Sequence, residues 1–324
     1  MTPLVVLLVL LLSSISPTLT LTTSSLPPSI SPYSKPDPLA FNEFVTAATT
    51  KALNEWVSSD SPKSVNGEID FPVMLCGLGS AGQKGAFDDF DNISELESNA
   101  AFVVNMCART GSLSNPSTYI IYPDLKELTV SKSSWVGSMY QKPTSTTIEQ
   151  LASHHTTWVQ PWGTKIAKFI SESSLGDTSL LPDLSLSPSS TLNIYVQPGD
   201  GGPVEDWINL SNIQGISPSR CVVVNGALDK VRGGYYPSLF FPDLARVANS
   251  FFKDGETWDG VFVLKKLAEK GRFGWLYRVY PGKWQVWEQI AKRGGAGNVE
   301  VEDVLKWEGE GRPEIGDAIG HLLA

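Results

Sequence analysis

Little in this sequence points to metal or nucleophilic chemistry. Its 324 residues include only three cysteines and three histidines. The adjacent His154 and His155 would diverge by about 100° on a helix, so both could not bind one metal ion. Neither a G-x-S-x-G nucleophile elbow, nor an H-E-x-x-H zinc motif, nor a kinase catalytic loop occurs. The sequence therefore predicts no metal site, and it offers no catalytic residue.

Basic residues are also in deficit. The chain has 25 lysines and arginines against 34 aspartates and glutamates, a net charge of −9. Proteins that bind nucleic acid present a basic face to the phosphate backbone. The densest basic run, from Lys265 to Arg272, is typical of a solvated helix face. We therefore expect no nucleic-acid partner.

The three cysteines do not form a disulfide pattern. Cys76, Cys107 and Cys221 are far apart and stand among apolar neighbours. Secreted domains that depend on disulfides normally show an even number of closely spaced cysteines. This pattern predicts buried thiols in a reducing compartment.

The N-terminus has the composition of a targeting leader. Residues 1–12 are apolar but too short for a membrane span of about 20 residues, and they suit the core of a signal peptide. A Ser-, Thr- and Pro-rich stretch without acids follows as far as Asp37, as in transit peptides. We expect a disordered leader over residues 1–38, resembling the bipartite leaders that direct proteins to plastids, and no transmembrane segment in the mature chain. Secretion is the alternative, with Asn92 and Asn209 as glycosylation acceptors.

The remainder alternates between helical and strand-like patterns. Helices are expected at residues 37–57, 93–107 and 203–213, and strands at residues 118–124, 193–199 and 221–226. Two continuous apolar strands around a helix indicate a parallel β-α-β unit. Aromatic strands on either side of Pro281-Gly282 indicate an antiparallel hairpin. We predict one α/β domain over residues 39–291, with a mixed, largely parallel sheet flanked by helices and a C-terminal antiparallel aromatic hairpin. Residues 292–324 are expected to form a tail with a short helix.

A G-x-G-x-x-G pattern at Gly77, Gly79 and Gly82 follows a short apolar run. In a dinucleotide-binding turn the third glycine opens a helix whose N-terminus meets the diphosphate. Here three aspartates occur between residues 88 and 91, and their charge would oppose a diphosphate. We therefore expect a weak phosphate-loop candidate and no bound cofactor. In the alternative, residues 100–105 form a second strand and Arg109 contacts the 2′-phosphate of NADP.

A second weak phosphate-loop candidate contains Gly199 and Gly201, between a predicted strand and helix. It lacks the Lys-Ser/Thr pair of a phosphate loop, and Asp200 would repel anions. Glu205 and Asp206 nearby could meet a cation, but acids are also favoured in the first turn of any helix. We interpret them as a solvated helix start.

Candidate binding residues lie where strands end. Asp124 and Asn225 each end a predicted strand, and they would lie at one edge if the strands are parallel neighbours. Arg232, Tyr235 and Arg278 could supply contacts to an anion or an aromatic ring. The competing interpretation is that Asp124 and Asn225 cap the following helix or turn.

Three segments carry a resemblance to a known family: IYVQPGDGGPVEDWINL, CVVVNGALDKVRGGYYPSLFFPDLA and GWLYRVYPGKWQVWEQ. Together with YIIYPDLKE they resemble the DUF1995 family of cyanobacteria and plastids. One plant member, low photosystem II accumulation protein 3, assists assembly of that photosystem, and the family has no accepted catalytic residues. The resemblance implies a non-enzymatic plastid protein of the stroma or thylakoid surface, with protein partners such as photosystem assembly intermediates. A nucleotide- or NADP-binding enzyme and a secreted binding domain are the alternatives.

Overall fold

The computed structural model describes residues 38–59, 65–72, 92–110, 118–133, 145–148, 151, 192–199, 205–216, 219–226, 228–233, 237–252, 258–293 and 299–324. Within these ranges, none of the helices combines the length and apolar character that a bilayer crossing requires.

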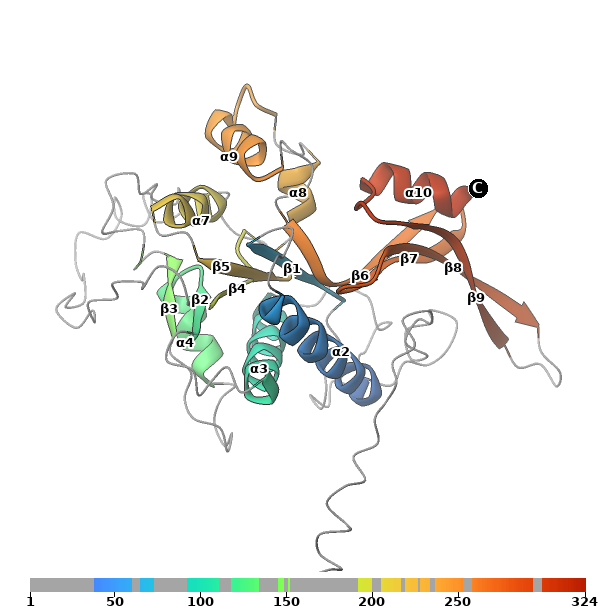
Figure 1. The fold of residues 1–324 in the computed structure, drawn as a ribbon, viewed down its shortest axis with the longest axis horizontal. Coiled ribbons are helices and arrows are strands. Elements are labelled where there is room, and N and C mark those ends of the chain that lie inside the picture. The colour runs from blue at the N-terminus through green and yellow to red at the C-terminus, as the bar shows by residue number, and fades with distance from the viewer. Residues whose placement is uncertain are drawn as a thin grey trace, which may run out of the picture.

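The described residues form one nine-stranded sheet flanked by helices (Figure 1). The strands are β1 (Asn66–Asp70), β2 (Thr118–Tyr122), β3 (Ser145–Thr147), β4 (Leu192–Val196), β5 (Arg220–Val224), β6 (Trp258–Glu269), β7 (Arg272–Val279), β8 (Trp284–Arg293) and β9 (Val299–Gly309). The helices are α2 (Pro38–Ser58), α3 (Asn92–Thr110), α4 (Leu125–Ser133), α7 (Glu205–Ile216), α8 (Leu228–Arg232), α9 (Pro242–Phe252) and α10 (Ile315–Leu323). Strand order across the sheet is β3-β2-β4-β5-β1-β6-β7-β8-β9.

The half from β3 to β6 is parallel and buried on both faces. Alternate side chains of a strand point to opposite faces, so Ile194 joins the cluster under α2 and α3 while Tyr195 joins the one under α7 and α9. This two-sided burial explains why β4 and β5 are continuous apolar runs. Figure 1 shows α2, α3 and α4 on one side of the sheet and α7, α8 and α9 on the other.

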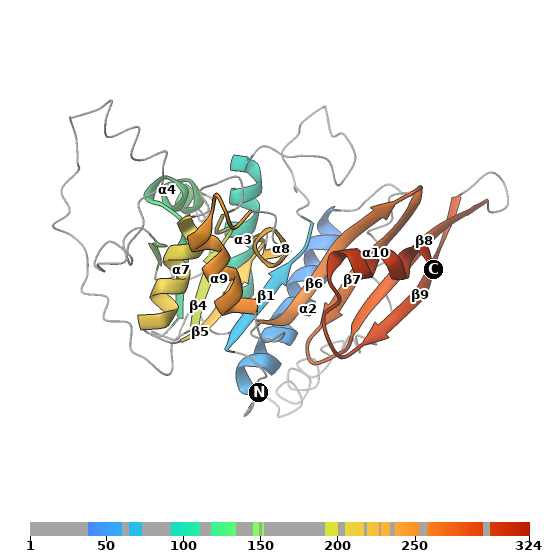
Figure 2. The ribbon, with the colours of Figure 1, turned by 90° about the horizontal axis from the view of Figure 1, so that it is seen from above.

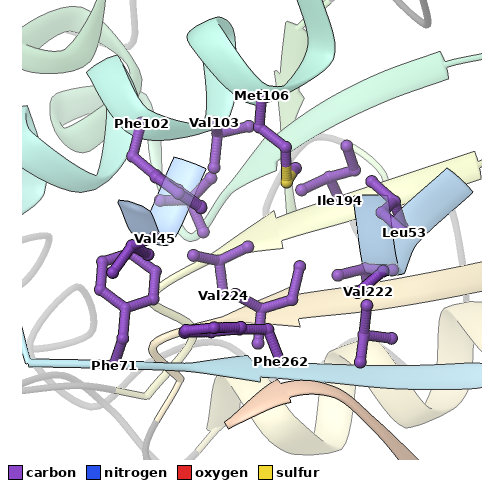
Figure 3. Close-up of a cluster of buried hydrophobic side chains, with 14 of the residues drawn as sticks. Val45, Leu53, Phe71, Phe102, Val103, Met106, Ile194, Val222, Val224 and Phe262 are labelled. Atoms are coloured by element: carbon purple, nitrogen blue, oxygen red, sulfur yellow. The ribbon is translucent and has the colours of Figure 1, made fainter. Parts of the chain in front are cut away.

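The larger core cluster lies between the sheet and helices α2 and α3 (Figure 3). Its side chains come from α2, α3 and α4 and from neighbouring strands, so segments far apart in sequence meet there. Those labelled in the figure are Val45, Leu53, Phe71, Phe102, Val103, Met106, Ile194, Val222, Val224 and Phe262.

The other half is an antiparallel meander from β6 to β9. Lys270 and Gly271 both have positive φ, at 49° and 79°, as the tight turn between β6 and β7 requires. Helix α10 lies across one face of this half (Figure 2) and buries Ala318 and Leu322 against Leu276 and Val286.

The structure confirms the predicted mixed α/β sheet, the parallel β4-α7-β5 unit and the aromatic hairpin of β7 and β8. Residues 100–105 belong to helix α3, so the alternative that made them a strand is wrong. The prediction that the basic run from Lys265 to Arg272 lies on a helix face is wrong. The apolar residues before this run form strand β6, which continues through the run into the β6–β7 hairpin. Strand β9 was not anticipated from the sequence, because its alternating acids lack a continuous apolar run.

Both described cysteines carry free, buried thiols, as expected. Burial raises the pKa of the Cys107 thiol to about 12, and Cys221 is shifted in the same direction. Neither thiol is therefore a nucleophile at neutral pH. Cys76 lies outside the described residues.

Candidate functional site

The parallel half has a topological switch point between β2 and β4. The chain leaves β2 for the edge strand β3, and it leaves β4 for β5 in the opposite direction. The following helices, α4 and α7, accordingly cover opposite faces of the sheet (Figure 1). In open α/β sheets ligands bind at the carboxyl ends of the strands at such a point. The topology therefore makes this edge of the sheet the first candidate for a binding site.

Asp124 stands at the switch point and caps a helix. Its Oδ1 atom accepts a hydrogen bond of 2.8 Å from the backbone N–H of Glu127, in the first turn of α4. The predicted partner Asn225 lies on the same edge, but β4 separates β2 from β5, so the two strands are not neighbours. The carboxylate of Asp124 therefore has a structural role in the cap.

Among the titratable groups at this edge, Asp206 has the most unusual environment. Its carboxylate is buried at the start of α7 and accepts a hydrogen bond of 3.1 Å from the N–H of Gly199. Burial raises its pKa to about 7, and the negative charges of Asp124 and Glu205 add to the shift. The interpretation of Glu205 and Asp206 as a solvated helix start is wrong, because both side chains are buried. A carboxyl group that titrates near neutral pH can give or take a proton.

Gly199 does not present a phosphate cradle. Its φ is +71°, and a Cβ atom there would lie 2.3 Å from Nε1 of Trp207. The N–H group that a phosphate would need already donates to Asp206. Since Glu205 and Asp206 also place negative charge at the N-terminus of α7, this helix start disfavours anions.

Asn225 holds the ends of two strands and a helix together. Its φ is +50°, a conformation that asparagine tolerates better than most residues. Its Oδ1 accepts a hydrogen bond of 2.9 Å from the N–H of Phe71, just after β1. Its Nδ2 donates one of 2.7 Å to Oδ1 of Asn99 on α3. The side chain is buried, so these bonds make Asn225 an internal brace.

Arg232 belongs to a buried ionic cluster on the α8 side of the sheet, which we call the ionic cluster. Its members are Glu68 and Asp70 of β1, Asp229 and Arg232 of α8, Lys265 of β6, and Arg312, which precedes α10. Oxygen atoms of the three carboxylates lie within 4.8 Å of one another, a spacing that could hold a metal ion. The three cations neutralise them, so a metal ion would have to displace a lysine or an arginine.

Charge pairing dominates the pKa values in the ionic cluster. Burial alone would raise the pKa of Glu68, but Arg232 and Arg312 hold it below its usual value. Burial also raises the pKa of Asp229, but the positive charges of Arg312 and Lys265 lower it by a larger amount. Burial would lower the pKa of Lys265, but the negative charges of Asp70 and Asp229 raise it above its usual value. Glu68, Asp229 and Lys265 therefore stay charged at neutral pH.

Arg278 braces the hairpin between β7 and β8. Its Nε donates a hydrogen bond of 3.1 Å to the carbonyl oxygen of Gly282 in the turn. The guanidinium stands 5.1 Å from the ring centroid of Trp284 and 5.9 Å from that of Tyr280. Desolvation lowers its pKa from the ordinary value, although Asp259 opposes the shift. These contacts make Arg278 a structural residue of the hairpin.

The remaining predicted residues, Tyr235, Gly77, Gly79, Gly82 and Gly201, lie outside the described residues. Sequence reasoning missed Asp206 as a buried acid and Arg312 as a partner of Glu68. A distance of 244 positions separates Arg312 from Glu68, and no local pattern could connect them. It also missed the exposure of Leu239, Phe240 and Phe241. The signal for these was present, because three consecutive apolar residues stand between Pro237 and a helix that begins with Pro242.

The model of a known protein family covers most of the chain. The sequence model of the family described as "Domain of unknown function (DUF1995)" matches residues 38–317. Neither the curated proteins nor the solved structures contain a significant match to the chain.

Proposed function

Since the chain belongs to the DUF1995 family, we propose that it is a non-enzymatic plastid factor that binds a protein partner during photosystem II biogenesis. Two sequence features support the proposal. One is its resemblance to a family with a plant member that assists photosystem assembly. The other is the leader-like composition of residues 1–38, which is independent of that resemblance.

The observation that carries the non-enzymatic part is the state of the polar groups at the sheet edge. Asp124 caps α4, Asn225 braces β1 against α3, and the N–H of Gly199 is bonded to Asp206. In a nucleotide-binding sheet these positions hold the ligand. In this chain the polar groups at these positions are hydrogen-bonded to other parts of the same chain. We therefore propose that the protein acts by recognising a partner at its surface.

The proposal is tested in the native cell. A fluorescent fusion is expected in the plastid, and loss of the gene should reduce the amount of photosystem II relative to photosystem I. Reintroducing the full chain should restore the ratio, while an Arg312→Met chain restores it less because it is less stable. A normal ratio in cells without the protein, or a fusion that is exported from the cell, would refute the proposal.

An enzyme is the second candidate, and Asp206 is the observation that favours it. A carboxyl group with a pKa near 7, at a switch point, is what general acid–base catalysis uses. A thermal-shift titration of the full chain with NADPH, ATP and AMP separates the two candidates. The binding factor should show no change in melting temperature, whereas a nucleotide-binding enzyme should show a rise that grows with concentration.

Secretion is the third candidate. One of its two glycosylation sequons is unsuited to this fold, because Asn209 is buried in α7 and a glycan there would prevent that helix from packing. The intact mass of the native protein decides the matter. A glycan on Asn92 would favour secretion over the plastid.

A further inference from the structure

An apolar turn stands exposed between α8 and α9. We call residues 237–242 the apolar tip. Leu239 is 84% exposed, Phe240 is 74% exposed and Phe241 is 37% exposed, and the three are consecutive. Single exposed apolar residues are common, whereas adjacent ones on a protruding turn mark an interaction site.

Part of the backbone of the apolar tip is hydrogen-bonded internally. The N–H groups of Phe240 and Phe241 both donate to the carbonyl oxygen of Pro237, each at 3.0 Å. Pro237 and Pro242 have no N–H group, and the carbonyl oxygen of Phe241 accepts from Ala245. Hydrocarbon offers a backbone no hydrogen-bond partner, so these internal bonds lower the cost of burying Phe240 and Phe241 in a bilayer.

The apolar tip is held rigidly by the helix that follows it. Leu244, Val247 and Phe251 fall on one face of α9 and are buried. Phe251 packs edge-on against Trp258 of β6, with ring centroids 5.5 Å apart. Because α9 lies in the outer layer on its side of the sheet (Figure 1), the tip meets an approaching surface without a change in the core.

Beside the apolar tip lies a cavity of about 500 Å³ between α8 and α9. Among the described residues, the charged ones that line it are Lys230 and Arg232, and Arg232 is paired with Glu68 and Asp229 in the ionic cluster. Apolar side chains such as Val231, Leu244 and Phe252 form the rest of its wall. The basic side chain of Lys230 beside an apolar protrusion matches the arrangement of an anionic lipid headgroup above its acyl chains.

We propose that the apolar tip inserts into the surface of an anionic lipid bilayer, with a headgroup held near Lys230. Leu239 and Phe240 lose contact with water, and their burial supplies the main driving force. The net charge of −9 opposes the approach of the chain to an anionic bilayer. The attraction between Lys230 and an anionic headgroup offsets this repulsion locally. The proposed function enters only in naming the thylakoid as the membrane; the lipid contact itself follows from the tip.

Vesicle co-sedimentation of the full chain tests the proposal. The vesicles contain phosphatidylglycerol and phosphatidylcholine in equal parts, and a second set contains phosphatidylcholine alone. The Leu239→Ser/Phe240→Ser variant should lose affinity by roughly tenfold or more, since two large apolar side chains no longer enter the bilayer. Lys230→Gln should lose roughly fivefold on the anionic vesicles and little on the neutral ones.

Leu39→Ser is the matched control. Leu39 is 72% exposed, and its exposed fraction is therefore similar to that of Phe240. It lies on α2, however, on the opposite side of the sheet (Figure 1). Its variant should bind vesicles as the unchanged chain does. All variants keep residues 1–38, so any contribution of that apolar segment is equal in each.

Several outcomes would overturn the proposal. They are equal vesicle binding by the Leu239→Ser/Phe240→Ser variant and the unchanged chain, absence of vesicle binding altogether, or a dimer that dissociates when the tip is changed. The two proposals fail separately. Vesicle binding without any effect of gene loss on photosystem II refutes only the proposed function, and the reverse result refutes only the lipid contact.

Discussion

Removing Arg312 should destabilise the protein strongly, although no enzyme site is involved. The Arg312 side chain is 9% exposed. Its guanidinium donates to Oδ1 of Asp229 at 2.7 Å and to Oε1 of Glu68 at 3.2 Å, and it lies 5.2 Å from the ring centroid of Trp284. It thereby connects the segment before α10 to strand β1 and helix α8. Arg312→Met keeps much of the apolar contact with Trp284 while it removes the charge.

The magnitude follows from what the variant leaves behind. Deleting one partner of a buried ion pair typically costs about 3–5 kcal/mol, because the other charge stays buried without compensation. Here Glu68 retains Arg232, and Asp229 retains Arg232 and Lys265, so we expect the lower end, about 3 kcal/mol. For a folded unit of this size that lowers the melting temperature by roughly 6–12 °C.

The loss should also depend on pH. The pKa values of Glu68 and Asp229 are both lowered in the folded chain, so their stabilisation is present above the unfolded values of about 4 and disappears as pH falls below them. Without Arg312, one of the two arginine charges that hold down the pKa of Glu68 against its burial is lost, so that this pKa rises. The difference between variant and unchanged chain is therefore largest near pH 7 and shrinks toward pH 3.

Urea unfolding followed by tryptophan fluorescence measures this, and Arg109→Met is the matched control. Arg109 makes two hydrogen bonds of similar length, 2.9 and 2.8 Å, to Glu43, but its side chain is 41% exposed. Exposed pairs contribute about 0.2–1 kcal/mol. Adding Glu68→Gln to Arg312→Met should recover stability, since it removes the uncompensated charge. Equal losses for the Arg312 and Arg109 variants, or a loss independent of pH, would refute the reasoning.

Three further predictions concern the sheet edge. Asn225→Ala should cost about 2–3 kcal/mol in urea unfolding, since it combines left-handed backbone strain with a buried N–H group that loses its partner; Asn225→Gly, which relieves the strain, should cost less, and equal losses would contradict this account. Gly199→Ala should lower the melting temperature well beyond Gly271→Ala, because both positions have positive φ but only at Gly199 does a Cβ atom meet Trp207, at 2.3 Å; the Gly271 variant should lose only about 1 kcal/mol. Asp206→Asn should stabilise the chain by up to about 4 kcal/mol at pH 8 and by little near pH 4. The raised pKa of about 7 means that ionisation of the buried carboxyl becomes costly as pH rises through 7, and an NMR titration of Asp206 with a midpoint near 4 would exclude this.

Local pattern was sufficient for most of the elements. The apolar runs of β4 and β5 around α7 identified a parallel unit, because strands buried on both faces must be apolar throughout. The aromatic segments around Pro281-Gly282 identified the β7–β8 hairpin. Strand β9 escaped detection because its exposed and half-buried residues alternate among acids, and its apolar partners lie on β8.

The role of each polar residue depended on the tertiary structure. The sequence alone determined the α/β class, the free thiols of Cys107 and Cys221, and the position of Asp124 and Asn225 at strand ends, since each of these follows from periodicity and composition over a few residues. Only the folded chain decided that Asn225 bonds to Asn99, that Arg312 neutralises Glu68, and that Asp206 is buried. The physical reason is distance along the chain: burial and charge pairing set the properties of these groups, and both are made by strands and helices that meet only after folding.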